Sequence, residues 1–358
     1  MAETVISGKD PAISVVIPCF RAGELLAEAI ESVLAQTEQD WELILVDNNA
    51  SEETRAVINR YVERYPKKIR SVLEKNQGNS SARNRGITEA KGVYIALLDD
   101  DDMMYPFRLE KQLEVIEKNP EASIVHGLLN DVAFDGNTIV NGNRSNDIQY
   151  WAHILFHDHP RFPSDPVISV APSVSLFSRK KALDIGGFDE RFNPCFGEDT
   201  EFSLRMWEKG PLLEIPVPLV AFRLPSQTYL KKKRENVSNW AQVARNTNTF
   251  FSILASKYYN KKKRDSVIRF QKIRAQWLRE ISHDVLMSED GVAVARFLLM
   301  RAIRDQPRDW KNWKWFFRTF LTKKNLLRKL KVHSFSQKNL KDLICPEDLM
   351  SFFRLPNE

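Results

Sequence analysis

The positions of hydrophobic and polar residues change period repeatedly along the first hundred residues. Short apolar runs rich in β-branched residues predict strands at residues 13–18, 41–46, 69–73 and 93–98. Between these runs, apolar residues recur at helical spacing in residues 24–36, 51–65 and 81–90. Ser51, followed by Glu52 and Glu53, is typical of a helix N-terminus. Strands that alternate with helices in this way predict parallel βαβ winding and an α/β fold.

The pattern continues less regularly over the next hundred residues. It predicts a helix over 106–118, a strand over 123–129, a hairpin around Asp135-Gly136-Asn137, a β-like segment over 167–178 and a helix that ends at Gly210. Residues 141–166 are irregular and rich in Asn, His and Pro. A loop of this length inside a compact domain is usually functional or mobile.

The fourth predicted strand ends in four consecutive acids, Asp99 to Asp102. Adjacent carboxylates repel one another, and hard divalent cations take oxygen ligands, so one interpretation is a metal site. Ligands of open α/β sheets bind at the carboxyl ends of the strands, which is where these acids stand. The other interpretation is a solvated acidic turn.

Two earlier predicted strands also end in polar groups, Cys19-Phe20-Arg21 and Asp47-Asn48-Asn49. A parallel sheet brings such ends to one edge, where a single site can collect them. The chain has neither a Gly-x-Gly-x-x-Gly motif nor a Gly-Lys-Ser/Thr phosphate loop. This absence disfavours dinucleotide-binding and P-loop proteins, and a nucleotide would instead be held through a carboxylate-bound metal.

A second acidic pair, Glu198 and Asp199, lies at or just before the start of the helix that ends at Gly210. There the helix dipole and the free backbone N–H groups keep a carboxylate ionised, as a general base must be. Ordinary helix capping is the commoner explanation of such a pair, and both interpretations stay open at this point.

Charge divides the chain into two parts. Residues 1–228 contain 24 Lys and Arg against 35 Asp and Glu, whereas residues 229–358 contain 29 against 12. We therefore predict an α/β domain over 1–228 and a basic helical domain over 229–358. The three cysteines, Cys19, Cys195 and Cys345, form no metal-ligand spacing and fit a reducing compartment. No apolar stretch predicts a signal peptide or a transmembrane helix.

The basic part mixes aromatic and cationic residues. Residues 231–234 and 261–264 are basic clusters, and residues 310–317 combine tryptophan and phenylalanine with lysine. This mixture suits an anionic membrane surface, where aromatic rings lie at headgroup depth and cations meet the lipid. The alternative is that Trp310, Trp313 and Phe317 pack a small helical domain onto the first domain. No recognisable motif predicts nucleic-acid binding.

Six short motifs together resemble a known family. In chain order they are Ser14-Val15-Val16-Ile17-Pro18, the Asp47 turn, Ala82-Arg83-Asn84-Arg85-Gly86, the Asp99 cluster, Gly186-Gly187-Phe188-Asp189-Glu190 and Gly197-Glu198-Asp199. Their order and spacing over residues 12–224 are similar to those of the family 2 glycosyltransferases, which are inverting enzymes. The resemblance implies the GT-A fold, a Rossmann-like and mainly parallel central sheet with flanking helices, here followed by a C-terminal α-helical region.

The resemblance also implies roles for individual residues. The residues expected to bind a nucleotide sugar are Pro18, Phe20, Asp47, Asn49, Gly78, Arg83, Asp99 and Asp100. Asp101 would bind Mn²⁺ or Mg²⁺, Asp199 would be the catalytic base, and Glu198 would stand beside it. The implied donor is a nucleotide sugar, with a UDP-sugar favoured, and the implied acceptor is a glycan or lipid-linked glycan.

Three departures from the family pattern bear on these roles. Cys19-Phe20-Arg21 stands where the family often has Thr-Tyr-Asn, and Asn49 stands where a second acid is common. The family often has a metal-ligating His after the last strand, and residues 221–227 contain none. The three histidines at 153, 157 and 159 lie too far upstream to fill that place, so we interpret them as loop residues.

The sequence therefore predicts an inverting, metal-dependent glycosyltransferase in the cytoplasm, on the inner face of a bacterial membrane, that builds a surface polysaccharide or lipopolysaccharide. Two alternatives are open. A nucleotidyltransferase of similar topology would need a glycine-rich, basic phosphate loop after the first strand, and Arg21-Ala22-Gly23 is a poor match. A non-catalytic scaffold would bind a membrane or partner through the basic part, and intact Asp101 and Asp199 argue against it.

Overall fold

The computed structural model describes residues 10–144, 169–193, 197–224 and 291–317, together with 271, 272, 274–276, 278, 279 and 282. The chain divides into two compact units, Met1–Ala152 with Pro160–Ser226 and His153–His159 with Gln227–Glu358. The domain boundary predicted between residues 228 and 229 lies outside the described residues and stays a prediction. The basic clusters at 231–234 and 261–264 and the three loop histidines also lie outside them.

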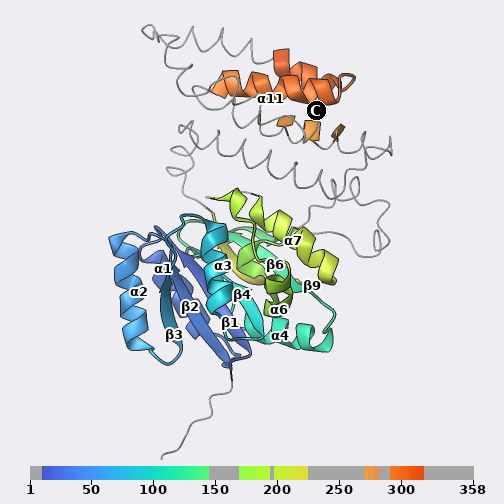
Figure 1. Cartoon of the computed structure of the whole chain (residues 1–358). Coiled ribbons are helices and arrows are strands. Elements are labelled where there is room, and N and C mark those ends of the chain that lie inside the picture. Colours follow the sequence, from blue (N-terminus) through green and yellow to red (C-terminus); the bar gives the residue numbers. More distant parts are fainter. Residues whose placement is uncertain are drawn as a thin grey trace, which may run out of the picture. The chain divides into compact units, whose positions relative to one another are not determined.

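The first unit is built on one mixed β-sheet (Figure 1). Its strands are β1 (Ile13–Cys19), β2 (Trp41–Asp47), β3 (Ile69–Leu73), β4 (Tyr94–Leu97), β5 (Met103–Met104), β6 (Ile124–Val132), β7 (Ile139–Arg144), β8 (Leu176–Ser178) and β9 (Leu212–Arg223). The strand order is β3-β2-β1-β4-β8-β6-β9-β5, and β7 pairs with β6. Strands β1 to β4 pair in parallel, β8 is antiparallel to both β4 and β6, and β6 is parallel to β9.

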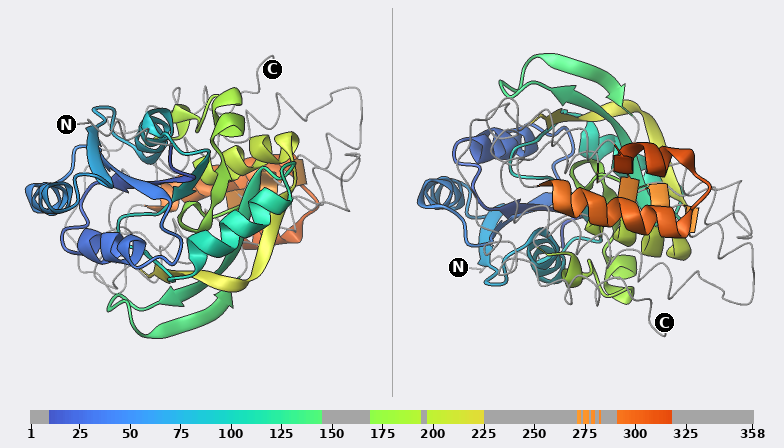
Figure 2. Two further views of the ribbon diagram at one scale, coloured as in Figure 1. Left: turned by 90° about the horizontal axis from the view of Figure 1, so that it is seen from below. Right: turned by 90° about the horizontal axis from the view of Figure 1, so that it is seen from above.

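Helices cover both faces of this sheet (Figure 2). They are α1 (Leu25–Leu34), α2 (Glu52–Arg64), α3 (Asn79–Glu89), α4 (Arg108–Lys118), α6 (Arg179–Asp184) and α7 (Glu198–Lys209), with short 3₁₀ turns η1 (Pro172–Val174) and η2 (Glu190–Phe192). Apolar residues of α1, α2 and α4 share one buried cluster, so these helices lie on the same face. Helix α3 packs on the other face, where a Cβ added at Gly86 would lie 2.2 Å from Val16 Cγ1.

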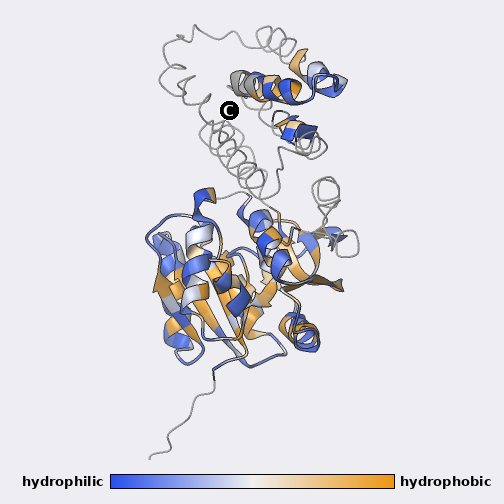
Figure 3. Ribbon diagram, turned by 45° about the vertical axis from the view of Figure 1, so that its right-hand side comes forward, coloured by the Kyte–Doolittle hydropathy of each residue, from blue (hydrophilic) through white to orange (hydrophobic). Residues whose placement is uncertain are grey.

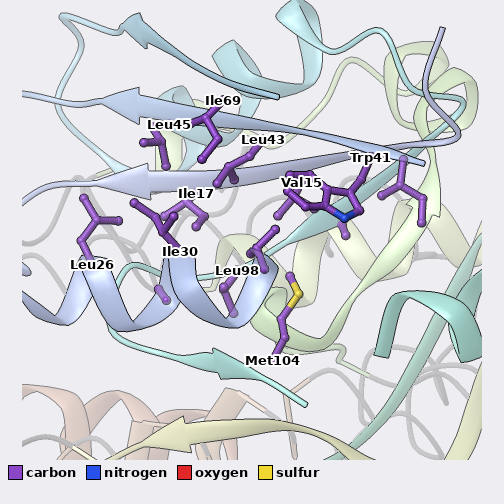
Figure 4. Close-up of a cluster of buried hydrophobic side chains, with 14 of the residues drawn as sticks. Val15, Ile17, Leu26, Ile30, Trp41, Leu43, Leu45, Ile69, Leu98 and Met104 are labelled. Atoms are coloured by element: carbon purple, nitrogen blue, oxygen red, sulfur yellow. The ribbon is translucent and has the colours of Figure 1, made fainter. Parts of the chain in front are cut away.

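Alternate residues of the central strands form the core (Figure 4). Val15 and Ile17 of β1, with Leu43 and Leu45 of β2, face the apolar side of α1. Their neighbours Val16, Ile44 and Val46 are equally buried, because the opposite face is covered as well. Strands buried on both faces have continuous apolar runs, which is the pattern from which they were predicted. Figure 3 shows the same division, with mostly hydrophobic strands and mixed surrounding helices.

Most of the predicted elements are confirmed, including the Ser51 cap, whose Oγ accepts a hydrogen bond from Thr54 N at 3.3 Å. The β-like segment predicted over 167–178 is largely wrong. Within its described part, only Leu176–Ser178 is a strand, and Pro172–Val174 form a 3₁₀ turn. Proline cannot donate a ladder hydrogen bond, so Pro172 interrupts the apolar run and shortens the strand.

The described residues of the second unit are helical except for the turn at residues 306–309. They include α11 (Gly291–Asp305) and residues 310–317. Arg274 makes two hydrogen bonds of 2.7 Å to Asp305, and Arg279 bonds Asp309 and Asn312, so buried polar pairs join the helical segments. None of the helices described by the structure has the length and hydrophobicity needed to span a bilayer.

Candidate functional site at the carboxyl edge of the sheet

The carboxyl ends of β1, β2 and β4 meet at one edge of the sheet, as parallel winding predicts. Asn48 N donates to Cys19 O at 3.0 Å, and Leu98 N donates to Val16 O at 3.1 Å. Phe20 N donates to Asp100 Oδ2 at 2.9 Å, which joins the end of β1 directly to the acidic turn. The ring of Phe20 is 36% exposed. Polar groups that are far apart in the sequence therefore lie together here.

The acidic turn, residues 99–102, uses its four carboxylates in different ways. Asp99 Oδ1 accepts a hydrogen bond from Arg83 at 2.9 Å, and Asp102 Oδ1 accepts one from Arg223 N at 2.8 Å. With Asp100 held by Phe20 N, three of the four carboxylates are bonded by other residues. Among the described residues, no other residue donates a hydrogen bond to the carboxylate of Asp101. Asp101 is therefore the carboxylate of the turn with neither oxygen bonded by another described residue.

Burial of the turn disfavours its negative charges. It raises the pKa of Asp100 to about 7 and that of Asp101 to about 6, and it raises the pKa of Asp102 well above its usual value. The neighbouring carboxylates act in the same direction. Asp102 is buried and the other three acids of the turn are half-buried. The turn is therefore partly exposed, and both interpretations made from the sequence stay open.

Arg83 of α3 connects the acidic turn to helix α7. Its side chain is 2% exposed, and its two terminal nitrogens donate at 2.9 Å to Asp99 Oδ1 and to Glu198 Oε1. The Phe188 ring covers the guanidinium at 5.4 Å. Burial alone would lower the pKa of Arg83, but the charges of Asp99 and Glu198 outweigh it and raise the pKa. Arg83 therefore holds two carboxylates, whereas the resemblance assigns it to the nucleotide.

Glu198 and Asp199 begin helix α7, as the sequence predicts. The preceding Gly197 has a φ of +92°, a left-handed conformation that favours glycine. Glu198 Oε2 is buried and has no hydrogen-bond partner among the described residues. Asp199 Oδ1 accepts a hydrogen bond from Thr200 N at 2.7 Å. Burial raises the pKa of Asp199 to about 6, assisted by the charge of Glu198 and opposed by that of Arg83.

The polar residues at the end of β2 have distinct partners. Asp47 accepts hydrogen bonds from Ala50 N at 2.8 Å and from Arg55 Nε at 2.7 Å. Asn49, with a φ of +58°, donates to the carbonyl of Lys75 and to the side chain of Gln77. The carboxylate predicted to contact the base is thus bonded within its own turn and by the following helix.

Asn48 is a site residue that the sequence analysis missed. Its buried side chain donates to Glu74 O and Asn76 O and accepts from Gly78 N at 2.8 Å. It therefore shapes the loop that leads to the N-terminus of α3, where Gly78 stands with a φ of +142°. Its place between two polar residues at a predicted strand end was a signal that could have identified it.

A second missed residue closes the same loop from the other side. Asn193 follows η2, and its Oδ1 accepts a hydrogen bond from Ser80 N at 3.1 Å. A Cβ added at Gly78 would lie 2.2 Å from this oxygen, so the close approach requires glycine. The two predicted motifs at 82–86 and 186–190 are also joined, because Asn84 donates to Phe188 O at 2.9 Å.

The described residues contain no group of three or more His, Cys, Asp or Glu side chains arranged to hold a metal ion. Asp101 nevertheless fits Mg²⁺ or Mn²⁺. These hard cations prefer oxygen ligands, and no other described residue donates a hydrogen bond to the carboxylate oxygens of Asp101. Mg²⁺ is often held by one or two carboxylates together with substrate phosphates and water. His126 is buried within β6, and its pKa is lowered by burial to about 4.

Comparison with known proteins identifies the domain. Residues 14–186 match the family model described as glycosyl transferase family 2. The chain carries a family 2 glycosyltransferase domain. The match includes the acidic turn and Arg83, and it ends just before Gly187. The mixed sheet with helices on both faces agrees with the GT-A fold that the family resemblance implied.

Several named relatives are similar to part of the chain. An uncharacterised glycosyltransferase of Nostoc sp. is 38% identical over 125 residues, which are 35% of this chain and 38% of the relative. The protein TuaG of Bacillus subtilis, provisionally named a teichuronic acid biosynthesis glycosyltransferase, is 39% identical over 105 residues, 29% of this chain and 41% of the relative. The chondroitin synthase of Escherichia coli is 29% identical over 140 residues, 39% of this chain and 20% of the relative. The chain thus spans well under half the length of these relatives.

Among solved structures, that of S. aureus TarS 1–349 in complex with UDP covers 82% of this chain and 88% of that chain, with 14% identity and a TM-score of 0.49. A likeness this distant carries no conclusion about the site.

Arg83→Gln should destabilise the first unit by about 3–5 kcal/mol, because it leaves Asp99 and Glu198 without their buried cation. Arg55→Gln is the matched control, since it removes an ion pair of Asp47 in which the arginine is 46% exposed. The control should lower the unfolding free energy far less, because an exposed ion pair is screened by water and salt. Urea unfolding of both variants measures the difference. Equal losses of unfolding free energy would show that the buried pairing does not stabilise the unit.

Proposed function

We propose that the chain is an inverting, metal-dependent glycosyltransferase that moves a sugar from a nucleotide-sugar donor to a hydroxyl acceptor. The observation that carries this proposal is the link between two acidic groups. Arg83 bonds Asp99 of the acidic turn and also bonds Glu198, the residue next to Asp199. A donor-side carboxylate cluster and an acceptor-side carboxylate pair are thereby held by one buried side chain. The family 2 domain supports the same reaction class.

The donor side of the proposed site is the edge formed by β1, β2 and the acidic turn. Pro18 and the partly exposed ring of Phe20 offer apolar surface to a nucleoside, and Asp47 and Asn49 stand at the end of the next strand. Asp101 would hold the divalent cation, which supplies positive charge to the departing diphosphate. We expect UDP as the nucleotide, as in the family resemblance. The residues themselves position the donor and exclude water from the sugar carbon.

The acceptor side is the start of α7. In the proposed reaction, the acceptor hydroxyl oxygen bonds the sugar carbon while the carbon–oxygen bond to the diphosphate breaks. The hydroxyl proton passes to the carboxylate of Asp199. This carboxylate is half-buried, and its pKa is raised to about 6, close to neutral pH. Attack from the side opposite the leaving group inverts the configuration. Glu198 Oε2 has no hydrogen-bond partner among the described residues, so Glu198 would orient the acceptor or the adjacent Asp199.

The acceptor we propose is a glycan or lipid-linked glycan of a bacterial surface polysaccharide. The provisional name of TuaG and the name of the chondroitin synthase, each similar to part of this chain, support a role in polysaccharide synthesis. A lipid-linked acceptor would place the enzyme at the inner face of the membrane. The second unit supports this location, because Trp310 is 67% exposed and Phe317 is 55% exposed, with lysines at 311 and 314. The packing of Trp310, Trp313 and Phe317 onto the first unit stays the alternative prediction.

The experiment that tests the function is a thermal-shift screen of UDP-, GDP- and dTDP-sugars and nucleoside triphosphates, with and without Mn²⁺. We expect a UDP-sugar to raise the melting temperature only when Mn²⁺ is present, because Asp101 holds the metal that binds the diphosphate. Calorimetry with Asp101→Asn should show donor binding weakened at least tenfold. Glu110→Gln, a substitution on the surface of α4, is the control. Full-affinity donor binding in EDTA would remove the metal from the proposal, and a preference for triphosphates would favour a nucleotidyltransferase.

Asp199→Asn should leave donor affinity and melting temperature nearly unchanged but lower turnover by a factor of about 10²–10⁴, the usual range for a general base. Asn keeps the shape and an oxygen that can accept from Thr200 N, but it cannot take a proton. Glu198→Gln should lower turnover less if Glu198 only orients the acceptor or its neighbour. Near-wild-type turnover of Asp199→Asn would place the base elsewhere, and a large drop in its melting temperature would indicate a capping role instead.

Turnover of the wild-type enzyme should rise with pH through about 6, where the Asp199 carboxyl ionises in the presence of Glu198 and Arg83. The stability effect has the opposite sign. Because the folded-state pKa of Asp199 is raised, its contribution to the unfolding free energy falls as pH rises from about 4 to about 6. A pH–rate profile at saturating donor measures the first effect, and a profile that is flat from pH 5 to 8 would contradict it.

The full chain should bind anionic vesicles through residues 231–234 and 310–315. Each lysine or arginine near an anionic surface contributes about 1 kcal/mol, and exposed aromatic rings add apolar contact. In flotation with phosphatidylcholine vesicles, with or without phosphatidylglycerol, we expect recovery only on the anionic vesicles. Trp310→Ala with Phe317→Ala should reduce recovery several-fold, whereas Phe134→Ala, which removes a 52% exposed ring from the first unit, should not. Equal recovery on both vesicles, or none, would rule out the lipid role.

A further inference from the structure

Arg223 is a buried arginine at the end of the last strand of the sheet that the proposed reaction does not yet use. It is the final residue of β9, and its side chain is only 2% exposed. It lies within the segment where the family often has a metal-ligating histidine and this chain has none. Burial of a guanidinium costs free energy unless its donors are bonded, so the partners of Arg223 indicate what it does.

Those partners are the acidic turn and the elements around it. The backbone N–H of Arg223 donates to Asp102 Oδ1 at 2.8 Å, and Nε donates to the backbone oxygen of Asp101 at 2.8 Å. One terminal nitrogen donates to Phe134 O at 2.6 Å, and the other donates to Glu28 Oε2 at 2.6 Å. One residue thus joins the turn to α1 and to the connection between β6 and β7.

The local backbone makes room for this side chain. Gly136 lies in the β6–β7 connection with a φ of +76°, and a Cβ added there would lie 2.8 Å from a terminal nitrogen of Arg223. Strand β5 pairs with β9 at Met103 and Ala221, which brings the end of β9 beside the turn. The position of the guanidinium is therefore determined by three separate parts of the first unit.

The contacts with the turn are made to its backbone and to Asp102, and they leave the carboxylate of Asp101 unbonded. A planar guanidinium holds several acceptors in one fixed geometry, which a lysine ammonium cannot reproduce. Groups that orient a metal ligand without touching the metal commonly change metal affinity by about 10–100-fold.

We propose that Arg223 is a positioning residue that fixes the acidic turn so that Asp101 is presented to the metal of the donor complex. The inference rests on the proposed function and adds to it a residue that the family motifs do not include. The family often has a metal-ligating histidine in this segment. In this chain the segment instead contains Arg223, which bonds the acidic turn.

The test measures metal dependence separately from activity. Calorimetric titrations of the full chain with a UDP-sugar at several Mn²⁺ concentrations give the Mn²⁺ concentration for half-maximal donor binding. Arg223→Gln should raise this concentration about tenfold or more, as expected for loss of a group that orients a ligand. Arg223→Lys should restore it only in part. Gly136→Ala, which keeps the charge but displaces the guanidinium, should shift the concentration in the same direction.

Arg70→Gln is the matched control. Arg70 also joins several elements, because it bonds Glu42 of β2 at 3.2 Å and the backbone oxygen of Glu89 of α3 at 2.6 Å, but it lies near the amino-terminal end of β3. It should lower the melting temperature without changing the Mn²⁺ requirement. If Arg223→Gln does not fold, Gly136→Ala decides the question.

The outcomes distinguish this inference from the proposed function. An unchanged Mn²⁺ requirement in Arg223→Gln and Gly136→Ala, with wild-type donor binding still dependent on metal, would overturn the role of Arg223 alone. Failure of the wild-type chain to bind any sugar nucleotide with Mn²⁺ would overturn the proposed function and, with it, this inference.

Discussion

A single buried guanidinium shared by two carboxylates organises the candidate site. Arg83, Asp99 and Glu198 come from α3, the acidic turn and α7, and the arginine is almost fully buried between them. Removing Arg83 would leave the buried Glu198 and the half-buried Asp99 without their cation, at a cost of several kcal/mol. The start of α7 is therefore held against the sheet edge by electrostatics as well as by apolar packing. The Phe188 ring over the guanidinium keeps water from weakening that attraction.

Local pattern was enough to predict most elements of the first unit, because buried strands and amphipathic helices have different periods. The strand order beyond β4 was not predicted. The next strand in the sheet, β8, has only three residues, and Pro172 interrupts the apolar run before it, so the local pattern did not define this strand. The residue types of the site were also predicted, as acids at a strand end and at a helix start. The pairing of Arg83 with Glu198 was not, because these residues are 115 positions apart and neither motif indicates the other.

Neighbouring residues of the same type have different roles in this site. The carboxylates of Asp99, Asp100 and Asp102 accept from a guanidinium, from the backbone amide that follows β1 and from a backbone amide of β9, whereas no other described residue donates to the carboxylate of Asp101. Asn48 is buried and orders the loop before α3, whereas the adjacent Asn49 is exposed in a left-handed conformation. A run of like residues predicts the chemistry of a site, but the direction of each side chain depends on backbone turns that the composition of the run does not specify.

The separation between Arg83 and Glu198 also has a consequence during synthesis on the ribosome. Strands β1 to β4 come from one continuous stretch, residues 13–97, so this parallel half of the sheet can assemble as soon as that stretch has emerged. The bond between Arg83 and Glu198 requires another hundred residues, including the whole of β6 and β8. In the nascent chain the guanidinium has only Asp99 as its carboxylate partner until α7 arrives. The parallel half of the sheet can therefore form early, whereas the cluster of Asp99, Arg83 and Glu198 is completed only when the domain is nearly whole.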